Sequence, residues 1–492
     1  ITPGSESATN MKDAMAIRDN VISSYDKGNS SLCAQDVENL RLWKLDSKMF
    51  DKTHQLTEEG SRDSQGLGSR LKQAFPKLLG KLDKENYTFR SAQGNGIEDS
   101  AKAFMNGLQN QGLVIDEVRE DYDVMFPYKN CAKYQSEVLD NPQTYAETKK
   151  YRESSEYLAM KDRIRRRVGV DYPLTDVNIT ALYDWCRYIW SGDDSKTSPW
   201  CALFTTEDLK VLEYAEDLEH FYKNGYGTAM NLQFGKVLLA DLFQHFREAK
   251  EGKGKQIVTY FTHDSMIEMV YTSLNLFRDD SPLTGARKNP KRKWRNSKFS
   301  PYSSNVLAVL NRCNAEKDYN VVFYLNEEPL LIPICKDGVC TWREFEDKLK
   351  SFSTAKPDFC YPYKYFSDTT PYNDVKGDIW NWIVKLKGTY RFIRQTVTLL
   401  REKSSFIYIY RLGANETDSI RERSYQVTII LAKLTFMPKK NGNLQTRKVD
   451  NTTLRTANKL KEEESDNGPT TPRLRTSFCA FFCVKYLSCR EN

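Results

Sequence analysis

The sequence is poor in histidine and contains no apolar run long enough to cross a membrane. Four of its 492 residues are histidines, so few positions can supply imidazole chemistry. A transmembrane helix needs about 18 or more consecutive apolar residues, and the mean hydropathy of this chain is −0.65. The sequence also lacks Cys-x-x-Cys pairs and zinc-finger spacings. These absences argue against a membrane span and a zinc-finger site, and they indicate a globular protein.

Charge is distributed unevenly along the chain. The formal net charge of +7 is modest for 492 residues and gives no indication of nucleic-acid binding. By count, the charge is roughly −3 over residues 1–360 and roughly +10 beyond them. We therefore expect residues 361–492 to form a basic extension that is poorly ordered. Its apolar stretch Phe478–Leu487 is too short to span a bilayer and has no assignable place in a core.

Cysteines and glycosylation sequons indicate the compartment. Eleven cysteines are many for a cytosolic protein of this size. Five Asn-x-Ser/Thr sequons accompany them, at Asn29, Asn86, Asn178, Asn415 and Asn451. Together they favour the secretory pathway, with the protein secreted, in the ER lumen or at the cell surface. Two disulfides are plausible from the spacing, Cys186 with Cys201 and Cys335 with Cys340.

The stretch from Ile257 to Phe277 predicts a buried strand followed directly by a helix. Ile257–Phe261 is rich in β-branched and aromatic residues, as a buried strand would be. Apolar residues then recur at helical spacing from Met266 onward. His263 and Asp264 fall at the junction, where open α/β sheets bind ligands and a helix N-terminus favours an anion. A histidine beside a carboxylate at this place indicates phosphate chemistry.

Other segments predict a mixed α/β fold with a helical insert. We expect residues 1–120 to form the first part of the α/β core, 121–250 the mostly helical insert and 251–360 the rest of the core. In the core we expect a helix from Leu56 to Phe75, a strand over Thr88–Ala92, a helix over Ser100–Leu108, and strands over Tyr319–Leu325 and Leu330–Ile334. In the insert we expect helices over Tyr134–Arg167, Val177–Ile189, Glu207–Tyr222 and Phe234–Ala249.

Six groups of residues occur in an order typical of one enzyme family. They are Leu56–Gly60 with Leu67–Arg70, Ser100–Phe104, Ser198–Phe204 with Val211–Tyr214, Tyr260–Asp264 with Pro282–Thr284, Pro301–Asn305, and Leu325–Pro329. This order resembles that of the multiple inositol polyphosphate phosphatases, a branch of the histidine acid phosphatases. The resemblance covers residues 1 to about 355 and leaves the basic extension out.

The resemblance implies a fold and a reaction. The family has a mixed sheet flanked by helices, with an inserted helical domain. Its members remove phosphates from inositol polyphosphates, in the secretory lumen or outside cells, and need no metal or other cofactor. A histidine in an Arg-His-Gly-x-Arg-x-Pro motif takes the phosphoryl group, arginines hold the phosphate oxygens, and a carboxylic acid protonates the leaving oxygen. The implied partner is a small-molecule inositol polyphosphate; oligomeric state and positional specificity on the ring stay open.

The chain departs from the family pattern at three places. The Arg-His-Gly-x-Arg motif is absent, and Pro3 falls where its proline would lie. We therefore expect the first strand and the nucleophile to precede Ile1, and the chain as given to be inactive. Gly96 occupies the place of a phosphate-binding arginine, for which nearby Arg90 could substitute. The family's inositol phosphatases usually carry His-Ala-Glu where this chain has His263-Asp264, the form of the wider acid phosphatases.

The candidate site residues follow from these patterns. His263 is expected to bind the transferring phosphate and Asp264 to act as general acid, which requires a raised pKa. Arg90 is either a phosphate ligand or a surface ion-pair partner. The run Arg165–Arg167 would suit a polyphosphate, although a solvated helix face explains it better. Of the remaining histidines, His54 is expected to be exposed, and His220 and His245 are expected to be structural.

Two alternative functions stay open. Gly96 at an arginine position favours a secreted binding protein on a phosphatase scaffold that has lost catalysis. Asp264 in place of the Ala-Glu pair favours an acid phosphatase of broad monoester specificity. The leading hypothesis is a phosphomonoester hydrolase that acts on inositol polyphosphates through a phosphohistidine.

Overall fold

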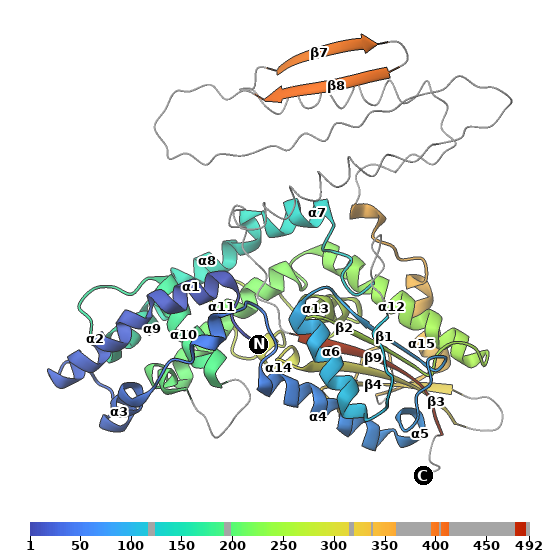
Figure 1. Ribbon diagram of the computed structural model, residues 1–492, viewed down its shortest axis with the longest axis horizontal. Helices are drawn as coiled ribbons and strands as arrows, with labels where there is room; N and C mark the ends of the chain where they lie inside the picture. Colours follow the sequence, from blue (N-terminus) through green and yellow to red (C-terminus); the bar gives the residue numbers. More distant parts are fainter. Residues whose placement is uncertain are drawn as a thin grey trace. The chain divides into compact units, whose positions relative to one another are not determined.

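The computed structural model describes residues 1–116, 124–190, 198–313, 319–335, 338–360, 395–402, 405–412 and 478–488 (Figure 1). The chain forms two compact units. One comprises Ile1–Pro362 with Thr470–Asn492, and the other Tyr363–Pro469. In the second unit, the described residues form one antiparallel hairpin of β7 (Gln395–Glu402) and β8 (Ser405–Leu412). The sheet, the helices and the site described below belong to the first unit.

The first unit is built on a mixed seven-stranded sheet in the order β1-β2-β9-β3-β4-β5, with β6 also paired to β4. β1 is parallel to β2, β9 is antiparallel to β2 and parallel to β3, and the remaining pairs are antiparallel. The strands are β1 (Tyr87–Ser91), β2 (Ile257–His263), β3 (Ser304–Arg312), β4 (Tyr319–Leu325), β5 (Glu328–Pro329), β6 (Val339–Thr341) and β9 (Phe478–Ser488).

The helices that accompany the sheet are α1 (Ser5–Asp13), α2 (Met15–Asp26), α3 (Ala34–Leu42), α4 (Glu58–Ala74), α5 (Pro76–Leu79), α6 (Asn95–Leu108), α7 (Ala132–Tyr134), α8 (Ala146–Arg152), α9 (Ser155–Val168), α10 (Asp176–Trp190), α11 (Thr206–Lys223), α12 (Ala229–Lys250), α13 (Asp264–Ser273), α14 (Asn296–Phe299) and α15 (Trp342–Leu349). None of the described helices is long and apolar enough to cross a membrane.

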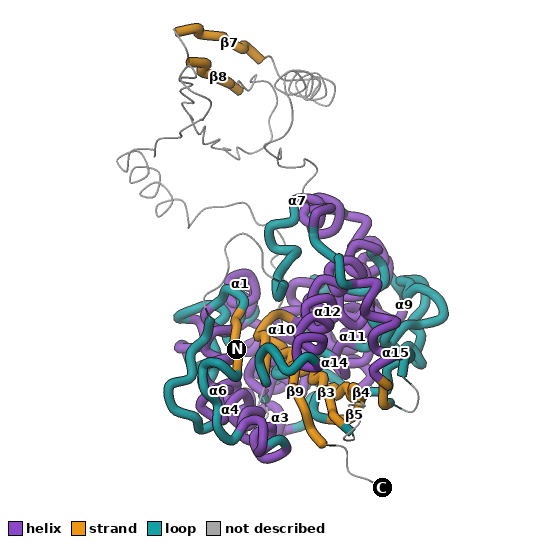
Figure 2. The backbone as a smooth tube through the Cα atoms, turned by 90° about the vertical axis from the view of Figure 1, so that its right-hand side faces the viewer, coloured by secondary structure: helices purple, strands orange, loops and turns teal. Residues whose placement is uncertain are grey.

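Helices cover both faces of the sheet. α4 and α6 lie on one side of it, and α12 and α15 on the other (Figure 2). Alternation along β2 explains this, because successive side chains point to opposite faces. Phe261 packs edge-on against Phe104 of α6, whereas Val258 and Tyr260 join the larger core on the α12 side. The prediction of a mixed sheet flanked by helices is confirmed.

Helix α4 packs closely against α6. Thr57 caps α4 by accepting a hydrogen bond from Gly60 N at 3.2 Å. A Cβ atom at Gly68 would lie 2.3 Å from the carbonyl oxygen of Phe104, so only glycine fits there. Gly66, on the same helix, would meet nothing nearer than the Arg70 guanidinium at 3.1 Å. The close contact therefore depends on Gly68 and is made with α6.

The first helices pack against the helical insert. α1 contacts α10, and α2 contacts α9. The indole of Trp185 donates to the Met11 carbonyl at 2.7 Å and stacks on Trp200 at 5.5 Å between ring centroids. The disulfide between Cys186 and Cys201 lies beside this stack. Residues 1–42, which the sequence placed with the α/β core, thus contribute helices to the helical layer.

Other features differ from the sequence-based expectations. The segment Tyr134–Arg167, expected to be helical, is divided among α7, α8, α9 and short turns between them. Residues 478–488, part of the stretch left outside the core, form β9 between β2 and β3 (Figure 1). Residues 330–334, predicted as a strand, have no strand conformation, and β5 and β6 flank them instead. The loop there is closed by the disulfide between Cys335 and Cys340, as predicted. A third disulfide, between Cys131 and Cys360, was not predicted.

Candidate active site

The junction of β2 and α13 has the predicted form. Every residue of β2 is buried, and His263 is both its last residue and the cap residue before α13. Asp264 opens the helix with 1% of its surface exposed. One of its carboxylate oxygens accepts a hydrogen bond from Ser265 N at 2.6 Å. The free N–H groups and dipole of the first turn make this end of α13 favourable for an anion.

A cavity of about 560 Å³ opens beside Asp264. This volume falls within the range of ordinary small-molecule sites. Apart from Asp264, its described walls come from α1, from residues 145–219 of the helical layer, from His220 and from residues 296–302. The ionisable side chains besides tyrosine that line it are Glu6, Arg152, Arg187, Glu216, Glu219, His220 and Asp264. Asp264 is therefore the point where the strand–helix junction meets the cavity.

His263 is held as a neutral imidazole. Its ring lies 4.5 Å from the ring of Phe126, centroid to centroid. Burial, followed by the nearby charges of Lys129 and His54, lowers the pKa of His263 to about 3. A neutral imidazole can donate one N–H and accept at the other nitrogen. His263 can thus act as a hydrogen-bond donor at neutral pH without carrying charge.

The surroundings of His263 include a histidine that the sequence predicted to be exposed. His54 is partly buried, and a Cβ atom on Gly4 would lie 2.8 Å from its Nε2. Lys129 lies over the Phe126 ring at 5.6 Å from the centroid and hydrogen-bonds to Gln93 in the loop before α6. The first residues of the chain and the β1–α6 loop therefore converge near His263.

His220 lies in the cavity wall, although the sequence indicated a structural role. Its Nδ1 lies 3.0 Å from both carboxylate oxygens of Glu268, and Asn224 also donates to Glu268, at 3.0 Å. Burial alone would lower the pKa of His220, but the charge and hydrogen bond of Glu268, with the charge of Asp264, raise it to about 9. The cavity is therefore lined by an imidazolium close to the Asp264 carboxylate.

Arg90 lies apart from this group. It pairs with Tyr260 in the parallel register of β1 and β2, and its guanidinium carbon is 5.7 Å from the Tyr260 ring centroid. Tyr260 in turn donates to Asp241 at 2.6 Å, and His245 Nε2 lies 3.3 Å from the same carboxylate. Because Tyr260 and His263 are three residues apart on β2, their side chains leave opposite faces. Arg90 is not among the described residues that line the cavity, and its role as a phosphate ligand stays a prediction.

Each arginine of the run Arg165–Arg167 on α9 forms an ion pair with a carboxylate. Arg165 and Arg166 pair with Asp162 at 2.8 and 3.1 Å, and Arg167 pairs with Asp208 at 2.7 Å. All three therefore have partners within the helical layer, and none of them is among the described residues of the cavity wall. A place on the helix surface therefore explains these arginines better than a role in polyphosphate binding does.

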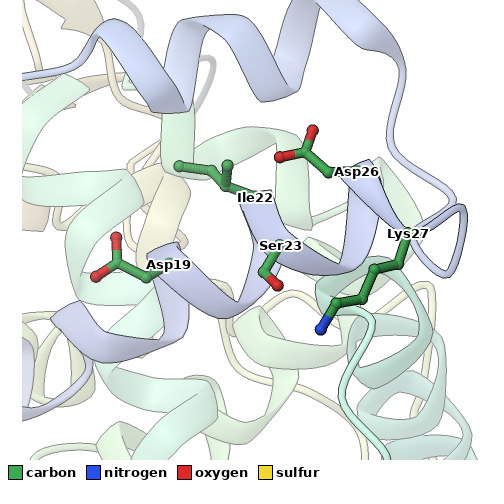
Figure 3. A pocket seen from close by; sticks show the side chains of 5 residues that line it. All are labelled: Asp19, Ile22, Ser23, Asp26 and Lys27. Carbon is green, nitrogen blue, oxygen red and sulfur yellow. The ribbon is translucent and has the colours of Figure 1, made fainter.

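A second hollow, of about 310 Å³, offers no comparable chemistry. Figure 3 shows its five lining side chains, Asp19, Ile22, Ser23, Asp26 and Lys27. They come from α2 and its C-terminal cap residue. Side chains from one helix surface do not converge on a common point as those of a binding site do. The cavity at Asp264 is therefore the candidate active site.

Comparison with known proteins supports a single family. Residues 12–326 match the histidine phosphatase superfamily (branch 2). The multiple inositol polyphosphate phosphatase 1 of Drosophila melanogaster is 28% identical over 352 residues, which is 69% of this chain and 74% of that protein. The human protein of the same name is 27% identical over 332 residues, 61% of this chain and 68% of its own length.

A solved structure supports the fold independently. The phytase from D. castellii superposes with a TM-score of 0.56 at 17% identity, covering 72% of this chain and 77% of that one. The mixed α/β prediction is thereby confirmed, and the family resemblance is confirmed by the match of residues 12–326. Since the family match spans well over half of the residues, this chain belongs to the histidine phosphatase superfamily, branch 2.

Proposed function

We propose that the protein is a phosphomonoester hydrolase that acts on inositol polyphosphates through a phosphohistidine. The observation that carries the proposal is the Asp264 carboxylate, which lines a partly open cavity at the start of α13; His263, the residue before it, is not among the described residues of the cavity wall. The names of the Drosophila and human relatives support the substrate class. The cavity volume of about 560 Å³ suits a substituted ring of small-molecule size.

Asp264 and His263 take different roles in this proposal. Asp264 delivers a proton to the leaving ester oxygen, so that an alcohol departs in place of an alkoxide. His263, neutral at working pH, donates its N–H to an oxygen of the transferring phosphate. The N-terminal N–H groups of α13 stabilise the negative charge of the same phosphate. His263 does not need to gain a proton in any of these steps.

The nucleophile is the part of the reaction that these residues do not supply. The Arg-His-Gly-x-Arg motif does not occur in the 492 residues. We therefore propose that the chain as given binds phosphate esters without turning them over. The test compares phytate hydrolysis by the 492-residue chain with hydrolysis by any longer form that the natural transcript is found to encode. Robust turnover by the 492-residue chain alone would contradict the phosphohistidine mechanism.

The same assay separates the two alternatives. A binding protein on this scaffold would bind phytate and hydrolyse nothing in either form. A broad acid phosphatase would hydrolyse a simple aryl phosphate much faster than phytate. Hydrolysis by the longer form with a clear preference for phytate is the result expected here.

We also propose that the protein acts in the secretory pathway. The disulfides Cys131–Cys360, Cys186–Cys201 and Cys335–Cys340 support this, because such bonds persist in oxidising compartments. The exposed sequon asparagine Asn29 is a suitable acceptor for glycosylation. A shift of the natural protein on gels after treatment with an N-glycosidase is expected; a fully reduced, unglycosylated natural protein would contradict the assignment.

A further inference from the structure

Arg152, the last residue of α8, lines the same cavity as Asp264. Its Nε is fully buried and has no hydrogen-bond partner among the described residues. The other arginine in the cavity wall is different, because Arg187 pairs with Asp184 and with Glu216, both at 2.8 Å. Within the described part of the chain, Arg152 is thus a cavity arginine that no carboxylate neutralises.

An arginine in this state favours an anionic ligand. The guanidinium stays protonated at all relevant pH values, and a buried donor without a partner costs free energy. Phosphate oxygens satisfy a guanidinium well, because they accept two parallel N–H bonds. A phosphate that entered the cavity would therefore give the Arg152 guanidinium, which lines the wall, an anionic partner that the described protein does not supply. The buried Nε joins this contact only if the side chain turns toward the cavity.

The three glutamates of the cavity wall do not remove this preference. Glu216 is paired with Arg187, and Glu219 accepts from Lys223 at 3.2 Å. Glu6 is exposed, so solvent screens its charge. His220 adds a second cation to the wall, since its pKa is raised to about 9 and its Nδ1 is already bonded to Glu268.

We propose that Arg152 binds a phosphate group of the substrate other than the one being removed, and so selects polyphosphorylated esters over monophosphates. This inference rests on the proposed function for the role of Asp264, which faces the same cavity. It makes Arg152 a specificity-determining residue. Its ligand chemistry is a phosphomonoester carried by the same ring as the scissile phosphate.

Binding measurements test the inference without requiring turnover. Phytate and inorganic phosphate are titrated into the 492-residue chain by calorimetry, with Arg152→Gln, Arg152→Lys and the control Arg166→Gln. Arg166 is a suitable control because it lies outside the cavity and is 63% exposed at its side chain. We expect Arg152→Gln to weaken phytate binding by about tenfold or more, Arg152→Lys to weaken it less, and Arg166→Gln to leave it unchanged.

Two binding results would contradict the proposed role of Arg152. Phytate affinity in Arg152→Gln equal to that of the parent chain, at a matched thermal midpoint, would overturn the inference. So would equal losses of phytate and inorganic phosphate affinity, because a single phosphate has no second group to lose. Should Arg152→Gln fail to fold, Arg152→Lys decides, since it keeps the charge and loses the two-pronged contact.

Hydrolysis by the longer form distinguishes this inference from the proposed function. If Arg152-dependent phytate binding occurs and no ester is hydrolysed, the subsite stands and the enzymatic proposal fails. If both phytate and an aryl phosphate are hydrolysed and Arg152→Gln slows both equally, the enzymatic proposal stands and the subsite is wrong. Selective loss of phytate hydrolysis supports both.

Discussion

His220 Nδ1 lies 3.0 Å from both carboxylate oxygens of Glu268, one helical turn after Asp264 on α13. This buried pair joins α11 of the helical layer to the helix that carries the proposed general acid. Its charge state is therefore coupled to the geometry of the site.

Stability should fall as His220 loses its proton. The folded-state pKa of His220 is about 9 against an ordinary value of 6.5, so its contribution is complete below about pH 6.5 and is lost as the pH rises through 9. We expect urea unfolding to show this loss between pH 6 and pH 10 in the parent protein. Glu268→Gln should remove the pH dependence and lower the free energy of unfolding at pH 6 by about 3 kcal/mol. The control Glu207→Gln, at a side chain that is 70% exposed, should change little; a flat parent profile over this range would refute the charged pair.

The strand–helix junction could be predicted from sequence because its signals are local. The β-branched and aromatic residues of Ile257–Phe261 predict a strand, and Asp264 directly follows the last residue of β2. The disulfide Cys335–Cys340 could be predicted for the same reason, since its cysteines are only five positions apart in the sequence. Helix α4 was also placed within two residues of its observed ends, because Thr57 and Pro76 mark them.

Features that depend on distant parts of the chain escaped prediction. β9 pairs with β2 across more than two hundred residues, and nothing in Phe478–Leu487 states which strands it will join. His220 was predicted to be structural, since the sequence around it gives no sign of its partner Glu268 on a separate helix. Arg152 lies in a charge-rich stretch of the sequence, where nothing distinguishes it from its neighbours. The consecutive arginines Arg165–Arg167, in contrast, form a recognisable basic run. Which arginine keeps an unmatched nitrogen depends on tertiary packing alone.

Removal of the proposed acid should affect poor leaving groups most. In whichever form of the protein hydrolyses phytate, Asp264→Asn should lower kcat for phytate by about a hundredfold or more, because an inositol alkoxide needs protonation to depart. A p-nitrophenyl ester, whose phenolate leaves readily, should lose far less. Steady-state rates on both esters measure the difference, with Asp19→Asn in α2 as a control outside the cavity. Equal losses on both esters would instead assign Asp264 to phosphate binding or to positioning.

Arg90→Gln decides between the two roles that the sequence left open for Arg90. Its place over Tyr260, beside Asp241, predicts a loss of about 1 kcal/mol in the free energy of unfolding. Phytate affinity should stay near that of the parent chain, because Arg90 is not among the described residues of the cavity wall. Arg62→Gln, on the exposed surface of α4, serves as the control. A drop of about tenfold in phytate affinity would restore the role of phosphate ligand.

Two glycines on α4 should respond in opposite ways to alanine. At Gly68, a Cβ atom would lie 2.3 Å from the Phe104 carbonyl oxygen and 3.2 Å from the Gly107 Cα. Because both atoms belong to the backbone of α6, the helices must separate, and we expect Gly68→Ala to cost about 2 kcal/mol or more. At Gly66, a Cβ atom would meet only the flexible end of Arg70 at 3.1 Å.

Gly66→Ala should therefore be neutral or stabilising by about 0.5 kcal/mol, since alanine loses less backbone entropy than glycine when a helix forms. The pair is a matched comparison, because both substitutions add one methyl group to the same helix two residues apart. Chemical unfolding of both variants at one pH gives the difference directly. If the two variants unfold at the same denaturant concentration, α4 and α6 do not approach as closely as the Gly68 contact requires.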